Sequence, residues 1–246
     1  MTRYRAAFIH LGLSGAVVAT VLALVFFVWY PDWSFQVAGA VTPVMVMVGV
    51  DLVLGPLLTL IVYKAGKPGL KFDLTFIAIV QLVALSYGSY TLYGARPHFL
   101  VFAVDRVVVV ARKHVDESAI RYPEISDMSI GNMIYAFARA PEDPEEFQEF
   151  LNSTLFEGKP DLEYRTEFWE PWSNGSDEIR DAITLLADFE PANEAEAAEA
   201  ATAIDRYGDA HPQLGFVAVG GLEEDIGLLI DAESLEILGV IHVNPW

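Results

Sequence analysis

The sequence has no cysteine, which excludes disulfide bonds, thiolate metal sites and cysteine nucleophiles. It also has no glycine-rich phosphate loop, no His-Glu-x-x-His motif and no Gly-x-Ser-x-Gly motif. These absences remove the local signatures of nucleotide binding, zinc proteolysis and serine hydrolysis. The five histidines lack the spacing of metal ligands; they are His10, His98, His114, His211 and His242. We therefore expect no enzymatic activity, no metal site, no cofactor and no small-molecule substrate.

Basic residues are scarce in the second part of the chain. Residues 98–246 carry nine Lys and Arg against 31 Asp and Glu, whereas residues 1–97 carry six basic and three acidic side chains. Such an acidic region repels nucleic acid and anionic lipid, so neither is expected to bind it. With 53% hydrophobic residues and a mean hydropathy of +0.35, the chain is too apolar for one soluble domain. We predict a membrane domain over residues 1–97 and an acidic soluble domain over residues 98–246.

The membrane domain is predicted to contain three spans, at about residues 6–30, 37–63 and 74–93. Each is long enough to cross most or all of a hydrocarbon layer about 30 Å thick. The sequence that follows the first span has no small-x-small cleavage site, so this span is expected to stay attached as a signal anchor. A short loop at residues 31–35 connects it to the second span.

The distribution of positive charge predicts the orientation in the membrane. Arg3 and Arg5 precede the first span, and three lysines, Lys64, Lys67 and Lys71, lie between the second and third spans. The loop between the first two spans has no basic residue. By the positive-inside rule, the amino terminus is cytoplasmic and the acidic domain lies on the opposite side, the periplasm of a bacterial inner membrane.

One acid lies in the middle of the second span. An ionisable side chain at bilayer depth is costly and usually marks a functional site. Pro56 has no N–H for the carbonyl of Leu52, so the helix is expected to open just past Asp51. Gly49 and Gly55 allow another backbone to approach closely. Asp51 either binds a partner or is a protonated acid that only fixes helix packing, and the sequence leaves both open.

Counting residues from the cytoplasmic ends of the spans suggests neighbours for this acid. At 1.5 Å per residue Asp51 and Ser86 lie about 18 Å deep and Thr20 about 21 Å, whereas Gln81 lies at only about 10 Å. Thr20 and Ser86 are therefore the predicted hydrogen-bond partners of Asp51. We take Asp51, Gly49, Gly55, Pro56, Thr20 and Ser86 as candidate partner-binding residues.

The soluble domain is predicted to be α+β, with a mostly antiparallel sheet of about four strands and two or three helices. Alternation and apolar runs indicate strands, and capping residues with helical spacing indicate helices. The expected elements are one long strand at 98–112, helices at 141–155, 176–189 and 193–207, and strands at 215–219, 226–230 and 235–243. Trp169 and Trp172 are either core residues or an exposed recognition patch, and burial frequencies favour the core.

Several motifs resemble those of the type IV pilin accessory proteins, often called TfpX/TfpZ. The resemblance covers about residues 5–110 and is concentrated in the second span. It is carried by Phe8-Ile9-His10-Leu11, Phe27-Val28-Trp29-Tyr30-Pro31, Gly49-Val50-Asp51, Leu54-Gly55-Pro56-Leu57-Leu58-Thr59-Leu60, Gln81-Leu82, Tyr87-Gly88, Ala95-Arg96-Pro97, Val104-Asp105-Arg106 and the closing Pro245-Trp246.

This resemblance implies a non-enzymatic inner-membrane helper that promotes assembly or stability of its cognate pilin. We expect the helper to meet the pilin's membrane helix within the lipid bilayer, beside Asp51, and the pilin head with the acidic domain. The alternative is a membrane-anchored extracytoplasmic sensor or enzyme in which Asp51 relays protons. A relay would need a second titratable group at the same depth, and the residue count finds none.

Overall fold

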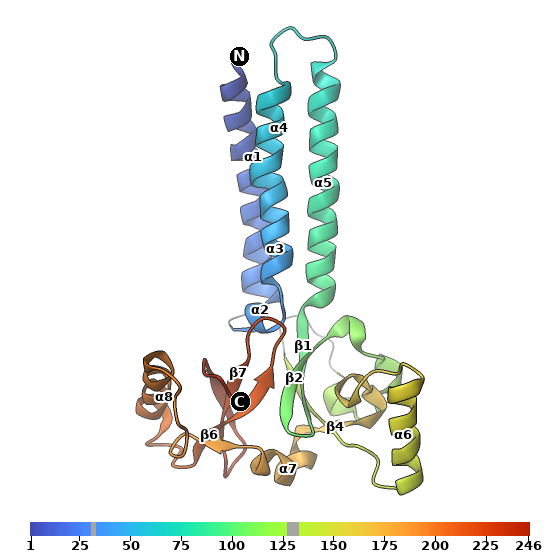
Figure 1. Ribbon diagram of the computed structural model, residues 1–246, viewed down its shortest axis with the longest axis vertical. Coiled ribbons are helices and arrows are strands. Elements are labelled where there is room, and N and C mark those ends of the chain that lie inside the picture. The colour runs from blue at the N-terminus through green and yellow to red at the C-terminus, as the bar shows by residue number, and fades with distance from the viewer. Residues whose placement is uncertain (31–32, 127–132) are drawn as a thin grey trace. The chain divides into compact units, whose positions relative to one another are not determined.

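A computed structural model describes residues 1–30, 33–126 and 133–246. The chain forms two compact units (Figure 1). The first consists of Met1–Phe35 and Ala40–Arg96, and the second of Gln36–Gly39 and Pro97–Trp246. The predicted loop at residues 31–35 lies partly outside the described residues.

Within its described residues, the first unit contains three helices that are long and apolar enough to cross a membrane, as the sequence predicts. They span Arg3–Trp29, Val41–Val62 and Leu70–Ala95. The first comprises α1 (Arg3–Leu24) and a π-helical end (Val25–Trp29), and the short α2 (Ser34–Val37) follows it. The second comprises α3 (Val41–Val48), a π-helical segment (Gly49–Leu54) and α4 (Gly55–Val62), and the third is α5 (Leu70–Ala95).

The third helix begins one turn earlier than the predicted residue 74. Gly69 adopts a left-handed conformation with φ +82°, and α5 starts at the next residue. Asp73 in its first turn forms an ion pair with Lys67, whose Nζ donates a 2.6 Å hydrogen bond to Asp73 Oδ2. The apolar run begins only after these polar residues, so hydropathy alone places the helix start too late.

The carboxyl-terminal ends of the first and third helices are joined by polar and aromatic contacts. The Tyr30 hydroxyl donates a 2.7 Å hydrogen bond to the carbonyl of Leu92, and both residues are buried. The rings of Trp29 and Tyr93 meet edge to face at 5.4 Å. These contacts hold the first and third helices together at this end.

Among the residues that the structure describes, the second unit is built on one sheet of eight strands, with the order β4-β3-β1-β2-β6-β7-β8 and β5 paired to β6. Five of the strand pairings are antiparallel, while β1–β3 and β2–β6 are parallel. This confirms the predicted α+β class with a mostly antiparallel sheet. The strands are β1 (Pro97–Ala103), β2 (Arg106–Ala111), β3 (Ile134–Ala138), β4 (Trp169–Pro171), β5 (Thr184–Leu185), β6 (Leu214–Gly220), β7 (Ile226–Asp231) and β8 (Ile237–Ile241), and the helices are α6 (Pro144–Phe156), α7 (Ser176–Asp181) and α8 (Glu194–Tyr207).

The predicted long strand at residues 98–112 is instead a hairpin of β1 and β2. Ala103 pairs with Arg106, so Val104 and Asp105 form a two-residue turn. Val104 has φ +62°, the left-handed conformation that such turns require and that valine rarely adopts. The prediction was wrong because the turn carries no glycine or asparagine, and apolar runs flank Asp105 and Arg106 on both sides.

The predicted helix at residues 176–189 also ends early. α7 stops at Asp181, and Thr184–Leu185 then joins the sheet as β5 beside β6. β-Branched residues at Ile183 and Thr184 fit a strand better than a helix. Pairing with β6 therefore overrides the helical spacing of the apolar residues.

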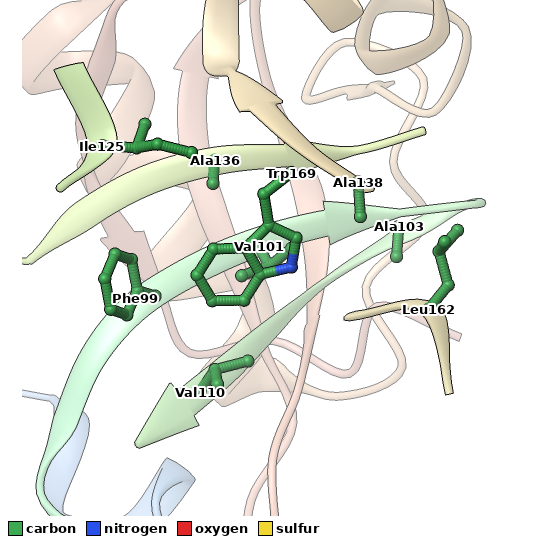
Figure 2. Packing of buried hydrophobic residues seen from close by; sticks show 9 residues of the cluster. All are labelled: Phe99, Val101, Ala103, Val110, Ile125, Ala136, Ala138, Leu162 and Trp169. Atoms are coloured by element: carbon green, nitrogen blue, oxygen red, sulfur yellow. The ribbon is translucent and has the colours of Figure 1, made fainter. Parts of the chain in front are cut away.

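Trp169 is part of the domain core, as burial frequencies favoured. Figure 2 shows its indole in the middle of a cluster that also contains Phe99, Val101 and Leu162. Trp169 is fully buried, its ring centroid lies 4.8 Å from that of Phe99, and its Nε1 donates to the Glu163 carbonyl at 3.1 Å. The cluster holds β1, β3 and β4 together.

A second apolar cluster lies where α8 meets β6, β7 and β8. Ala200 and Ala203 of α8 are buried there with Phe216 and Leu229. Asn193 caps α8 by accepting hydrogen bonds from the N–H groups of the first turn. The small alanines allow the helix to lie close to the strands.

The segment Gln36–Gly39 belongs to this second unit although it follows the first span. The Val37 carbonyl accepts a 2.8 Å hydrogen bond from the N–H of Leu222, and Val37 is buried. Gly39 has φ +69°, and a Cβ at this position would lie 3.0 Å from the Leu222 Cβ. The loop between the first two spans is therefore attached to the β6–β7 connection.

Candidate functional site

Asp51 lies in the π-helical segment Gly49–Leu54, so the helix does open at the acid. The N–H of Gly55 donates to the Val50 carbonyl, five residues back. Pro56 has no N–H to donate to the Asp51 carbonyl at the same spacing. The carbonyl of Asp51 therefore loses its donor within the helix, and π-helical turns of this kind are frequent at functional sites.

Gln81 of α5 supplies the missing donor. Its Nε2 donates to the Asp51 carbonyl at 3.2 Å and to Asp51 Oδ1 at 3.1 Å. Gly55 makes room for this amide, because a Cβ at Gly55 would lie 2.1 Å from Gln81 Nε2. Asp51, Gly55, Pro56 and Gln81 therefore form one polar unit between the second and third spans, which we call the Asp51–Gln81 unit.

Two acceptor atoms of this unit have no hydrogen-bond partner among the residues that the structure describes. They are Asp51 Oδ2 and Gln81 Oε1. Asp51 is 4% exposed and Gln81 is 7% exposed. A buried polar atom without a partner costs about 1–3 kcal/mol. Both atoms thus have unused capacity to accept a hydrogen bond.

The unit lines a groove between α1 and α5 of about 410 Å³. The walls are largely apolar and include Ile9 and Leu13 of α1 with Leu82 of α5. Asp51 and Thr59 of the middle span lie at its floor, and Thr59 Oγ1 is 2.5 Å from His10 Nδ1. The groove therefore has apolar walls and polar side chains, Asp51 and Thr59, at its floor.

The structure brings some of the predicted site residues together and places the others apart from them. Asp51, Gly55 and Pro56 are buried together, and Gly49 has no atom within 4 Å of an added Cβ. Thr20 and Ser86 are exposed.

The predicted hydrogen bonds from Thr20 and Ser86 to Asp51 are therefore wrong. The Thr20 hydroxyl donates to the Ala16 carbonyl at 2.9 Å. Asp51 is instead bonded to Gln81, which the sequence analysis placed too near the cytoplasmic side. Counted from the actual start of α5 at Leu70, Gln81 is about 16 Å deep, close to the depth of Asp51. An amide in an apolar span was a signal that pointed to Gln81.

Charged groups of the second unit form structural pairs. Arg139 contacts Glu178 at 2.7 Å and Glu170 at 3.4 Å, and it donates to the Asn174 carbonyl at 2.8 Å. A hydrogen bond from its own backbone N–H and the Arg139 guanidinium lower the pKa of Glu178. Within residues 1–30, 33–126 and 133–246, no group of three or more His, Asp or Glu is arranged to hold a metal ion.

Comparison with known proteins gives a consistent result. A family model described as "Fimbrial assembly protein FimB" matches residues 1–33. The "Fimbrial assembly protein, serogroup I" of Dichelobacter nodosus is 33% identical over 184 residues, which are 73% of this chain and 70% of that protein. The protein of serogroups C1 and C2 is 37% identical over 107 residues, 42% of this chain and 81% of that relative. No solved structure matches the chain. This chain belongs to the fimbrial assembly protein family, a family of type IV pilus accessory proteins.

Proposed function

We propose that this protein is a non-enzymatic helper in type IV pilus assembly that binds its cognate pilin and promotes the assembly or stability of that pilin. The observation that carries the proposal is the alignment of 184 residues with a fimbrial assembly protein. An alignment of this length is longer than the whole membrane unit, so it includes part of the sheet domain. Both units are thus common to the two proteins, which supports a function that uses both.

Two contacts are proposed, one for each unit. The apolar helices contact the membrane helix of the pilin within the bilayer, and the acidic sheet domain contacts the pilin head. Asp51 is proposed as a contact residue, whereas Gly55 and Pro56 act indirectly by placing Gln81 and the Asp51 carbonyl. Gly49, Thr20 and Ser86 remain candidates for contacts on the outer surfaces of the helices.

The proposed location is a bacterial inner membrane, with the amino terminus in the cytoplasm and the sheet domain in the periplasm. Arg3, Arg5 and the three lysines of the 64–71 loop support this orientation. The hydrogen bond between Val37 and Leu222 also supports it, because it requires the first loop and the sheet domain to lie on one side. An alkaline phosphatase fusion after residue 246 is expected to be active, and a fluorescent fusion active only in the cytosol would contradict the orientation.

The function is tested by deletion and capture. Deletion of the gene is expected to lower pilin levels or the number of pili, and expression of the wild-type chain should restore them. The tagged wild-type chain should also co-purify the pilin from detergent-solubilised membranes. Normal pili after deletion, or the absence of pilin from the purified complex, would contradict the proposal.

A further inference from the structure

We infer that the groove between α1 and α5 holds the membrane-spanning helix of the pilin, and that this helix donates hydrogen bonds to Asp51 Oδ2 and Gln81 Oε1. The inference rests on the proposed function in one respect, the choice of the pilin as occupant. The groove itself, its walls and its unpaired acceptors are features of this chain.

The hydrogen bonds of the floor determine what the occupant has to bring. Gln81 Nε2 has two hydrogens, and both are donated to Asp51, one to its carbonyl and one to Oδ1. The remaining atoms, Asp51 Oδ2 and Gln81 Oε1, only accept when the acid is ionised. In hydrocarbon no water is present to satisfy them. With Asp51 ionised, the occupant must therefore carry a donor, such as a hydroxyl, an amide, an amine or a protonated acid, and an ionised carboxylate is excluded.

The walls determine the kind of molecule. Ile9, Leu13 and Leu82 line the groove and are 48%, 66% and 58% exposed. An acyl chain would fit these apolar walls but has no donor for the floor. A polypeptide in the bilayer satisfies its own backbone only as a helix or a closed barrel. A single helix with one polar side chain at the depth of Asp51 meets both requirements.

A second hollow in the membrane unit meets the two requirements, apolar walls and access to both acceptors, less well. It has about 350 Å³, lies between α4 and α5, and reaches Gln81 but not Asp51. Lys67 and Asp73 lie on its rim and are already paired with each other. Of these two hollows, the α1–α5 groove is therefore the one lined by both residues that carry an unpaired acceptor.

Site-specific photo-crosslinking in cells that express the pilin tests the inference. The crosslinking amino acid replaces Leu13 or Leu82 in the groove, and Phe8 or Val83 as controls on the same helices. The two controls are 72% and 63% exposed and do not line the groove. We expect pilin adducts at the groove positions to exceed those at the controls by about tenfold.

The outcomes separate the inference from the proposed function. Equal or stronger pilin adducts at Phe8 and Val83 would overturn the groove while leaving pilin binding intact. Lipid adducts alone, or adducts with a second copy of this chain, at Leu13 and Leu82 would also overturn it. Adducts with a different membrane protein would overturn the choice of the pilin. Pilin absent from every adduct and from the purified complex would remove the proposed function as well.

The donor requirement has its own test. Asp51→Asn keeps the size of the side chain but replaces one acceptor oxygen with a donor NH2 group. With the crosslinker at Leu82, we expect pilin adducts to fall about tenfold, because a hydrogen bond to a charged group is lost. Tyr90→Phe, at a position that is 76% exposed and does not line the groove, should change nothing. An unchanged adduct in Asp51→Asn would overturn the donor requirement.

A second variant covers the possibility that the Asp51 variant does not fold. Leu13→Trp fills the groove from its wall and leaves the polar floor untouched. It is expected to reduce pilin adducts from Leu82 about tenfold while the amount of folded chain stays the same. Undiminished adducts would overturn the groove as the docking site.

Discussion

Gly55→Ala is expected to destabilise the membrane unit through the hydrogen bonds of Gln81 and not through the clash itself. The added Cβ would lie 2.1 Å from Gln81 Nε2, so the two cannot coexist. The amide is the far end of a flexible side chain and can swing away. It would then give up both of its hydrogen bonds to Asp51.

The magnitude follows from these two bonds. Hydrogen bonds between membrane helices contribute about 0.6 kcal/mol on average and about 1–2 kcal/mol in model peptides. With one bond to a carboxyl group, we expect their loss to cost about 1–3 kcal/mol. The Gly→Ala change also gains about 0.5–1 kcal/mol from helix propensity. The net destabilisation should be about 0.5–2 kcal/mol.

The effect of Gly55→Ala on the free energy of unfolding should change sign when Gln81 is absent. In a Gln81→Ala background no amide is left to displace, so Gly55→Ala should stabilise by about 0.5–1 kcal/mol. Unfolding in detergent by titration with SDS, followed by circular dichroism, measures all four members of this double-mutant cycle. Gly49→Ala is the matched control, since nothing lies within 4 Å of its Cβ, and it should not destabilise in either background. An equal cost of Gly55→Ala in both backgrounds would refute the reasoning.

Three further predictions concern the cores of both units. Hydrogen bonds from Ser234 lower the pKa of Asp231 against the opposing effect of burial, so Asp231 stabilises the fold above about pH 4 and loses this contribution as the pH falls through its lowered pKa. Asp231→Asn should thus cost about 1–2 kcal/mol at pH 7 in thermal unfolding, and this cost should shrink as the pH falls below about 4; a pH-independent difference would contradict this. Trp169→Ala should cost about 3–5 kcal/mol in denaturant unfolding because it empties the cluster centre, and a cost below about 1 kcal/mol would show that the cluster collapses around the space. The double variant Asp51→Leu with Gln81→Leu should unfold at an equal or higher SDS concentration than the wild type. Its crosslinked adducts with the pilin should decrease. A strongly destabilised double variant would mean that the pair is needed for folding.

Features that depend on composition and on single residues could be predicted from the sequence. Apolar length identified the three spans, and Pro56 identified the opening of the helix at Asp51. The helix predicted at residues 193–207 and the strands predicted at 226–230 and 235–243 were similarly local, and they correspond to α8, β7 and β8. Such features are predictable because their cause lies within a few residues of their effect.

Features that depend on pairing between distant segments were missed. The start of α5 at Leu70 lies in a polar stretch, and an error of one turn moved Gln81 out of the depth of Asp51. The β1–β2 turn has a valine at its position of positive φ, and only the pairing of Ala103 with Arg106 reveals it. The parallel pairings of β1 with β3 and of β2 with β6 likewise depend on contacts between distant segments, which no local sequence pattern contains.

The Asp51–Gln81 unit is difficult to explain as a stabilising device for this chain alone. It needs a π-helical opening, a proline and a glycine in the middle of a span, and it still leaves two acceptors unpaired among the described residues. Apolar side chains would fill the same space without these costs, since buried polar pairs are often no more stable than apolar replacements. A donor from a docked helix would satisfy the acceptors and recover the cost on binding. If the double leucine variant folds as well as the wild type or better but contacts the pilin less, the Asp51–Gln81 unit has a binding role. If it loses stability, the unit has a packing role.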